Sequence, residues 1–488
     1  MADLAFDNTI EDSLQKRYRQ PKGVEQFGIE AIPEARKTVR WYDLFAIILN
    51  FLISPSTILR GGLGVAAGLS FQASVVAECS GIVVAAVFYV VMATVGVDYG
   101  IPGQVATRAI YGLRGSKAIP SFLRSIASCY WFAFQTVIGA TAICAVLQKL
   151  TGTAYSLILV SVLFGIVQAL VAIVGYESLR QLSRIALPVK LLMFGYLFWL
   201  LAHQSDPNFA PSAVWAFTGK SGWDWVIFVA WFNAAAAGWL TMITDSADFC
   251  RYSRSRTDMW IGTLSASAVG TMISGSLGAY AAAATLGKTA NPFVLIAGIS
   301  TSWITLALIL VFIALDNWTI NVLNLYTGGL SLSNMFERLG RFWTTVIISL
   351  LGIALSATPD VVKGYTTYVS LLGNVFAPIG GVLIADYIFV KRMHIDLVGL
   401  FEPNGPYWFW KGVNPVAVAW TAFGFLAYTF VIPAEWIRVL VPVLVTGAGY
   451  WATVWLLAPR FDRLALASHP TLVQREAVED LDWELAVR

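Results

Sequence analysis

The residues best suited to chemistry are polar side chains set inside long apolar runs of the chain. Asp316 and Thr319 lie three residues apart in one such run, so they share a face of a helix. A carboxylate there can accept a hydrogen bond from a solute N–H, hold a proton or neutralise a cation. The alternative is a structural partner for a polar group on a neighbouring helix. Because ionisable groups at membrane depth are costly, we interpret Asp316 as functional.

Trp131 and Gln135 form a second pair, four residues apart on one helix face. An indole offers a flat stacking surface, and a glutamine amide offers both a donor and an acceptor. This combination suits a flat, polar heterocycle. The alternative is an aromatic core residue beside a buried amide, and the pair alone does not separate the two.

The elements that must position these residues are membrane-spanning helices. Of the 488 residues, 57% are hydrophobic and only 12% are charged, whereas soluble domains carry about 25% charged residues. Apolar runs of about 20 residues, the length that crosses a bilayer as a helix, recur from Tyr42 onward. We therefore predict an all-α membrane protein with about twelve spans. The predicted spans are 42–59, 71–96, 119–148, 153–175, 183–202, 221–246, 260–286, 302–333, 342–358, 365–390, 414–433 and 436–458.

The positions of Lys and Arg predict the orientation, because cytoplasmic loops carry an excess of positive charge. With the N-terminus inside, most of the 32 Lys and Arg residues fall in cytoplasmic segments. The exceptions are Arg60, Lys149, Lys220, Lys288, Lys363 and Arg438. We therefore expect both termini in the cytoplasm and the spans in the plasma or inner membrane of a cell.

The chain divides into three predicted parts. Residues 1–41 form a cytoplasmic N-terminal tail, 42–458 form the membrane domain, and 459–488 form a loosely structured cytoplasmic C-terminal tail. The stretch 287–300 is too short and too polar at its start to span, so we expect an outside re-entrant or surface helix there.

Two predicted spans are interrupted at matching positions. The first contains Ser54-Pro55, and a proline inside a helix removes a backbone hydrogen bond. The sixth contains Gly238, which permits unwound backbone. Paired interruptions of this kind indicate the central site of a transporter. An ordinary proline kink and an ordinary small-residue contact are the alternatives.

Other charged residues are weaker candidates. Glu78 lies in the second span, and Asp245 lies near the inner end of the sixth. The cluster of Asp248, Arg251, Arg254 and Arg256 is most simply a solvated inner loop. A phosphate-binding Gly-rich loop is absent from the sequence, and with only three histidines no Ser/His/Asp set can be argued, so we expect no enzyme and no cofactor. Transport must then use an ion gradient or be passive.

Four stretches carry a family resemblance. They are Gly112–Ser116 with Pro120 and Tyr130-Trp131-Phe132 with Gln135; Gly238-Trp239 with Asp248-Phe249-Cys250-Arg251-Tyr252; Asn317-Trp318-Thr319-Ile320-Asn321 with Leu325-Tyr326 and Gly329-Leu330; and Pro378-Ile379-Gly380-Gly381 with Ala385-Asp386-Tyr387. Through them, residues from about 20 to 458 resemble the nucleobase:cation symporter family, which includes the purine and cytosine permeases and their hydantoin and allantoin relatives.

The resemblance implies a LeuT-like fold of two inverted five-helix repeats, at about 42–202 and 221–390, followed by two extra helices at about 414–458. It also implies a flat base held between Trp131 and Trp239. Gln135 would supply hydrogen bonds to the base through its side chain, and Gly238 through its backbone.

The resemblance also implies a possible sodium site, in which backbone carbonyls near the break of the first helix meet two adjacent hydroxyls on the eighth. In this sequence the expected groups are Phe51, Ser54 and Thr319, while Ile320 replaces the second hydroxyl. An alkyl group cannot bind a hard cation, which prefers oxygen. Both Na⁺ and H⁺ therefore stay open as the coupled cation. Asp316 falls where cytosine permeases carry an amide that faces the base, so it is expected to read the solute and to carry a coupled proton.

Together these features predict a secondary active importer of a nucleobase or related small N-heterocycle, such as cytosine, a purine, allantoin or a hydantoin. Its partners would be the solute and the bilayer, without nucleic acid, and the monomer would be functional. Two alternatives stay open. One is a passive channel or facilitator, since small polar linings also suit pores. The other is a symporter of a vitamin precursor or an amidine-like cation.

Overall fold

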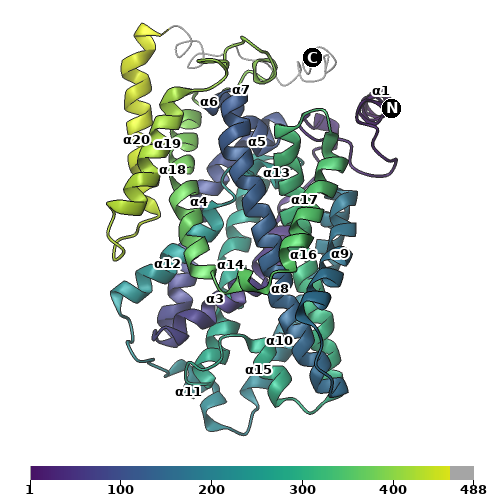
Figure 1. Cartoon of the computed structure of the whole chain (residues 1–488), viewed down its shortest axis with the longest axis vertical. Helices are drawn as coiled ribbons and strands as arrows, with labels where there is room; N and C mark the ends of the chain where they lie inside the picture. Colours follow the sequence, from purple (N-terminus) through teal and green to yellow (C-terminus); the bar gives the residue numbers. More distant parts are fainter. Residues whose placement is uncertain (1, 462–488) are drawn as a thin grey trace.

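The computed structural model describes residues 2–461, which form a bundle of helices along one long axis (Figure 1). Within this part of the chain, β structure is limited to isolated bridges such as that between Val39 and Ser253. The all-α prediction is therefore confirmed. Most of the predicted C-terminal tail, from residue 462 onward, lies outside the described residues.

Each predicted span contains one long helix or a pair of helices. They are α2 (Trp41–Leu52) with α3 (Pro55–Ala66), α4 (Phe71–Tyr99), α8 (Phe122–Thr151), α9 (Leu157–Val174), α10 (Tyr176–Ala202), α12 (Trp225–Leu240) with α13 (Ser246–Cys250), α14 (Arg256–Ala284), α16 (Trp303–Met335), α17 (Gly340–Ser356), α18 (Tyr365–Ala385), α19 (Pro415–Phe430) and α20 (Leu440–Leu457). By length and composition, seven helices of the described chain can cross a membrane, or eight if α2 and α3 count as one span. The helices α12, α17 and α19 are apolar but have only 16 or 17 residues.

Helix α1 (Ala2–Tyr18) precedes the first span. Short helices lie between later spans: α5 (Gly103–Ala106), α6 (Arg108–Tyr111), α7 (Leu113–Ser116), α11 (Pro211–Trp215) and α15 (Pro292–Ile299). Single 3₁₀ or π turns lie at Glu34–Arg36, Lys117–Ser121, Pro207–Phe209, Pro359–Val362, Asp386–Val390, Val398–Leu400 and Ala458–Arg460. Helix α15 falls in the stretch 287–300 that was not expected to span.

The first span breaks between α2 and α3, which meet at a bend of 52°. Pro55 is the first residue of α3, a position where the missing N–H of proline costs nothing. The preceding Ser54 is extended, with φ of −139° and ψ of 154°. The predicted proline interruption is therefore a true break that leaves backbone carbonyls at the end of α2 free for other partners.

The sixth span breaks after Leu240, where α12 ends and a turn leads to α13. Gly238, the expected point of unwinding, still belongs to α12, so the break lies two residues later. Asp245 lies between the break and α13. Both breaks therefore lie in the spans where the sequence predicts them.

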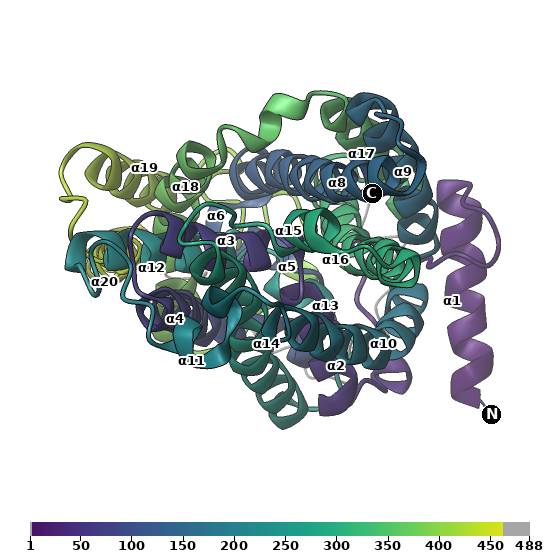
Figure 2. The ribbon, with the colours of Figure 1, turned by 90° about the horizontal axis from the view of Figure 1, so that it is seen from below.

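Helix α14 packs closely against α3 and holds it near the middle of the bundle (Figure 2). A Cβ atom on Gly278 would lie 1.7 Å from the carbonyl oxygen of Ile58, and one on Gly61 would lie 2.2 Å from that of Gly275. Only glycine allows two backbones to approach so closely. This contact fixes the second half of the broken helix.

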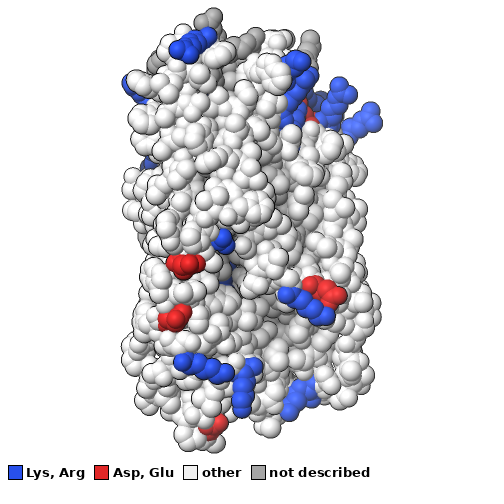
Figure 3. Space-filling view, turned by 60° about the vertical axis from the view of Figure 1, so that its left-hand side comes forward, with Lys and Arg blue, Asp and Glu red and all other residues white. Residues whose placement is uncertain are grey.

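The outer surface is apolar along the length of the helices. Leu170 on α9, Leu192 on α10 and Leu444 on α20 are each at least 63% exposed. On the face that Figure 3 shows, a broad band almost free of charged side chains separates the Lys and Arg residues at one end from charges nearer the other. Such a band suits lipid, where helices must satisfy their own backbone hydrogen bonds.

Part of the predicted N-terminal tail packs against the bundle. Phe27, Ile29 and Ile32 are at most 2% exposed, and Glu25 is buried among the ends of several helices. The carboxylate of Glu25 accepts hydrogen bonds from the Arg251 guanidinium, the Tyr252 and Tyr326 hydroxyls and the Tyr176 backbone N–H, and pairs with Arg341. Residues 20–32 are therefore an ordered part of the molecule.

Candidate functional site

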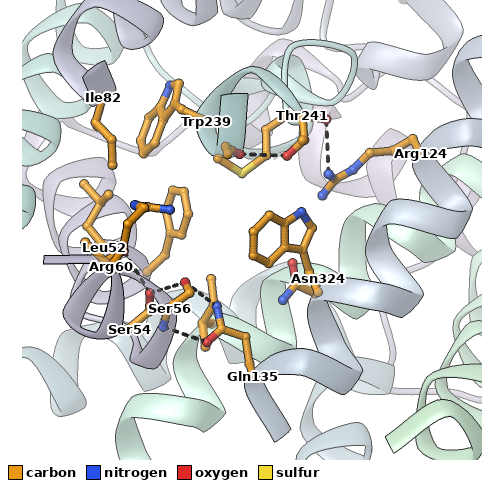
Figure 4. Close-up of a pocket in the computed structure, with 16 residues that line it drawn as sticks. Leu52, Ser54, Ser56, Arg60, Ile82, Arg124, Gln135, Trp239, Thr241 and Asn324 are labelled. Carbon is orange, nitrogen blue, oxygen red and sulfur yellow. Dashed lines mark hydrogen bonds between the residues drawn. The ribbon is translucent and has the colours of Figure 1, made fainter. Parts of the chain in front are cut away.

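A small cavity lies where the two broken helices meet α4, α8 and α16 (Figure 4). Its volume is about 40 Å³, above the ~10–15 Å³ that one water needs and well below the ~150 Å³ of an engineered cavity that binds benzene. A heterocycle is larger than this, so the side chains that surround the cavity must part before a base can enter. The cavity is therefore in a closed arrangement. Six of the predicted site residues line it: Phe51, Ser54, Trp131, Gln135, Gly238 and Trp239.

Aromatic rings fill much of the space between the helices. Trp239 stacks on Phe51, with centroids 5.1 Å apart, and touches Tyr89 at 5.5 Å. Trp131 contacts Phe134 edge to face at 5.8 Å and Tyr365 at 6.4 Å.

The two indoles that line the cavity carry unused hydrogen-bond donors. The indole nitrogens of Trp131 and Trp239 are buried and have no hydrogen-bond acceptor among the described residues. Buried donors without an acceptor are uncommon, so these two N–H groups are suited to acceptors on a solute.

The amide of Gln135 connects α8 to the start of α3. Its oxygen accepts a hydrogen bond from the Ser56 backbone N–H at 3.1 Å, and its nitrogen donates to Ser56 Oγ at 2.7 Å. The Ser56 N–H lies in the first turn of α3 and has no partner inside the helix. Gln135 therefore satisfies this turn in the closed state while it lines the cavity.

The backbone of Gly238, expected to bind the base, is engaged differently. Its carbonyl oxygen accepts a hydrogen bond from the Thr241 hydroxyl at 2.8 Å. A Cβ atom at position 238 would lie 3.1 Å from Nη1 of Arg60. Glycine at this position therefore leaves room for a guanidinium at the cavity wall.

Arg60 is a lining residue that sequence reasoning missed. Its guanidinium pairs with Glu78 on α4, with Nε 2.7 and 2.6 Å from the two carboxylate oxygens, and Nη1 donates to the Tyr365 hydroxyl at 3.2 Å. Both charged side chains are at most 4% exposed. Glu78, noted only as a weak candidate, is thus one half of a buried ion pair.

Arg124 of α8 lines the cavity opposite Arg60 (Figure 4). Its Nε lies 2.8 Å from Asp245 at the second break, and its other nitrogens donate to the Thr241 carbonyl and the Thr327 hydroxyl. Arg124 and Asp245 are at most 1% exposed. A signal for both ion pairs was present in the sequence, since each acid requires a partner at membrane depth.

The predicted inner loop at 248–256 is not uniformly solvated. Asp248 and Arg251 are completely buried, and Asp248 accepts a hydrogen bond from the Gly103 backbone N–H at 2.8 Å. Only the later part, which includes Arg256, is exposed. The interpretation of the whole cluster as a solvated loop was therefore wrong, because tail and helix ends cover its first half.

Helix α16 presents Ile320 and Asn324 to the cavity, whereas Asp316 is not a lining residue. Asp316 lies eight residues before Asn324, which is about 12 Å along a helix. Asn324 was not singled out from the sequence. It lies four residues after Ile320 and therefore on the same helix face, and this spacing was the signal that could have identified it.

Asp316 instead meets Lys190 of α10 in a completely buried ion pair, with Nζ 2.9 Å from Oδ1. The same Nζ donates to the backbone carbonyls of Asn50, at 2.8 Å, and Ile53, at 2.7 Å, beside the first break. It also lies 3.1 Å from Oγ1 of Thr319. One of the two interpretations of Asp316 was that it pairs with a polar group on a neighbouring helix. Such a partner is present, and it is Lys190.

These residues do not fit a free sodium ion. Thr319 is present as expected, but the converging carbonyls belong to Asn50 and Ile53, each one residue before the expected Phe51 and Ser54. Phe51 stacks on Trp239 instead, and the Ser54 hydroxyl lies 3.1 to 3.2 Å from the hydroxyls of its neighbours in α3. The Lys190 ammonium already occupies the space between the converging oxygens.

An apolar helix bundle with two broken spans that meet at a closed polar cavity defines a membrane transporter of small solutes. The chain belongs to the family of permeases for cytosine/purines, uracil, thiamine and allantoin, whose family model matches residues 31–454.

Individual relatives agree with this assignment. A hydantoin permease of Microbacterium maritypicum is 29% identical over 422 residues, which cover 82% of this chain and 83% of the relative. A cytosine permease of Escherichia coli strain K12 is 26% identical over 448 residues, covering 91% of this chain and 96% of the relative. These similarities confirm the family resemblance and a transporter rather than an enzyme.

A solved structure confirms the LeuT-like fold. The chain is similar to Mhp1, a nucleobase-cation-symport-1 family transporter, in a closed conformation with bromovinylhydantoin bound. The TM-score is 0.78 at 23% sequence identity, and the match covers 93% of this chain and 98% of Mhp1.

Proposed function

We propose that this permease imports a nucleobase or a related flat, neutral N-heterocycle by cation-coupled symport with alternating access. One observation carries the proposal. Two buried indoles, each with a free N–H, and the amide of Gln135 line a single closed cavity between two broken helices. Ring faces favour a flat solute, and the free N–H groups favour one with hydrogen-bond acceptors.

The charges around the cavity favour a neutral solute. Arg60 is paired with Glu78, and Arg124 is paired with Asp245, so neither guanidinium is left to attract an anion. Asp316, the acid that would favour an amidine-like cation, is paired with Lys190 away from the cavity. These pairings argue against the cationic alternative.

The substrate class is tested with purified protein. We expect members of the heterocycle series cytosine, purines, allantoin and hydantoins to raise the unfolding temperature, because a ligand that binds only the folded state stabilises it. Trp131→Ala should abolish this shift, since it removes one stacking face. Trp455→Ala, which alters an indole that is 71% exposed on α20, is the matched control and should leave the shift unchanged. Unchanged affinity in Trp131→Ala would contradict the stacking role.

For the coupled cation we propose H⁺ rather than Na⁺. The support is that an ammonium already lies among the oxygens where a sodium ion would be held. In reconstituted vesicles, an inward proton gradient should drive accumulation of the solute in the absence of sodium. Accumulation that follows only the sodium gradient would contradict this.

We also propose that the monomer works in the plasma or inner membrane of a cell with both termini in the cytoplasm. The distribution of Lys and Arg along the sequence supports this orientation. A reporter fused to the C-terminus should read as cytoplasmic, and an external reading would reverse the assignment.

A further inference from the structure

The position of Lys190 has a consequence beyond the proposed choice of proton. Its ammonium is surrounded by oxygens from two elements besides its own helix. Asn50 and Ile53 contribute backbone carbonyls at the end of α2, while Thr319 and Asp316 contribute a hydroxyl and a carboxylate from α16. Carbonyls at the end of a broken helix are the groups that hold coupling cations in transporters.

The local charge balance leaves no room for a second cation. Asp316 is the only Asp, Glu, Lys or Arg in α16, and α9, which also packs on α10, has none. Helix α2 carries one acid, Asp43, which pairs with Arg180 and Arg184 elsewhere along α10. Lys190 therefore neutralises Asp316 by itself, and an added free cation would leave an uncompensated buried charge.

The ammonium also joins the two repeats. Lys190 and the end of α2 belong to the first predicted repeat, whereas Asp316 and Thr319 belong to the second. Alternating access moves one repeat or bundle against the other around the central site. A cation between α2, α10 and α16 is therefore positioned to stabilise one arrangement of the repeats over another.

We propose that Lys190 is a tethered cation that permanently occupies the cation site of this permease, and that removing its ammonium converts the same oxygens into a binding site for free sodium. That this site serves the coupled cation rests on the proposed cation-coupled symport. That the Lys190 ammonium occupies it does not rest on that proposal. In Lys190→Ala, two carbonyls, one hydroxyl and one carboxylate remain, and a hard monovalent cation prefers such oxygen ligands.

The test measures the unfolding temperature of purified protein in NaCl and in choline chloride at equal ionic strength. The wild type should unfold at the same temperature in both salts. Lys190→Ala should be less stable than the wild type in choline chloride, because Asp316 loses its partner, and sodium should restore stability in a saturable manner.

Three matched variants sharpen the comparison. Lys190→Met fills the space with an apolar side chain and should be destabilised without a sodium response. Lys190→Ala combined with Asp316→Asn removes the acidic ligand and should lose the sodium response. Lys149→Ala, which changes an exposed lysine at the end of α8, should behave as the wild type in both salts.

Two results would overturn the proposal: sodium stabilisation or sodium-stimulated uptake in the wild type, or a folded Lys190→Ala that does not respond to sodium. If Lys190→Ala cannot be purified, the comparison of the wild type in the two salts still tests the proposal. Because the salt comparison needs no solute, its failure is distinguishable from a failure of the heterocycle screen.

Discussion

At the scale of single residues, the permease holds its charges in pairs that cross between helices. In the pair of Arg60 and Glu78, one member was recognisable from the sequence and the other was not. Glu78 is recognisable as an acid at membrane depth, but Arg60 was assigned to an outer loop because the first predicted span ended at residue 59. The second half of the broken helix continues to Ala66, so the guanidinium lies inside the bundle.

Glu78→Gln should strongly destabilise the protein. The substitution leaves the Arg60 charge buried without its counter-charge, and breaking a buried ion pair in this way costs roughly 3–5 kcal/mol. Replacing both residues by methionine removes both charges and should recover most of the lost stability. Unfolding temperatures of the single and double variants in one detergent give the comparison. If the single and the double variant were equally stable, the unpaired charge of Arg60 would not be the cause of the loss in Glu78→Gln.

Ile320→Ser separates two explanations of sodium independence. It restores the hydroxyl that the family resemblance expects next to Thr319, but it leaves the Lys190 ammonium in place. We therefore expect uptake by Ile320→Ser to be the same in NaCl and in choline chloride. If sodium stimulates this variant, the missing hydroxyl, and not the lysine, is what excludes sodium.

At the scale of elements, the N-terminal segment 20–32 joins the ends of several helices through Glu25. Although burial alone would raise the pKa of Glu25, the guanidinium groups of Arg341 and Arg251 and the Tyr252 hydroxyl lower it below its ordinary value of 4.5. A carboxylate with a lowered pKa stabilises the docked segment above that ordinary value. The stabilisation is lost as the pH falls through the lower value.

The protection of backbone amides in 20–32 against hydrogen exchange, measured relative to an unstructured chain at the same pH, should therefore stay high from neutral pH down to about pH 4.5 and fall only in stronger acid. Glu25→Gln should release the segment at neutral pH, since it replaces charge-assisted hydrogen bonds worth roughly 1.5–3 kcal/mol each. Protection that is unchanged in Glu25→Gln would mean that the apolar contacts of Phe27 and Ile32 suffice.

Elements with a strong local signal were predictable, and elements that depend on distant partners were not. Long apolar runs located the main helices of the bundle, and Pro55 located the first break to within two residues. The docking of the N-terminal segment had no comparable signal, because its composition is polar and its buried stretch from Phe27 to Ile32 is short. Its partners lie on helices far away in the sequence.

At the scale of the whole molecule, the closed cavity and the two breaks distinguish a transporter from a pore. A passive channel was an alternative from the sequence, and a cavity of only about 40 Å³ between two broken helices is the arrangement expected of a carrier rather than of an open pore. Six of the predicted site residues meet at this cavity because the family resemblance supplied their helices. The roles of Asp316 and Lys190 could not be predicted, since their pairing depends on how α10 packs against α16.

Vesicles loaded with unlabelled solute should take up labelled solute by counterflow, and under an inward proton gradient they should accumulate it above the external concentration. A carrier whose site opens alternately to the two sides of the membrane shows both behaviours, whereas a pore cannot accumulate its solute. If the solute only reaches equal concentrations on both sides and shows no counterflow, the protein is a passive channel and not a carrier.

A side chain that carries the cation also changes how the protein depends on its surroundings. A dissolved ion must be captured from the medium in every cycle, so its occupancy follows the salt concentration outside the cell. Lys190 is linked to α10 by covalent bonds, and its effective concentration at Asn50, Ile53 and Asp316 is set by the fold alone. The permease should therefore bind its solute with the same affinity in fresh and in saline water.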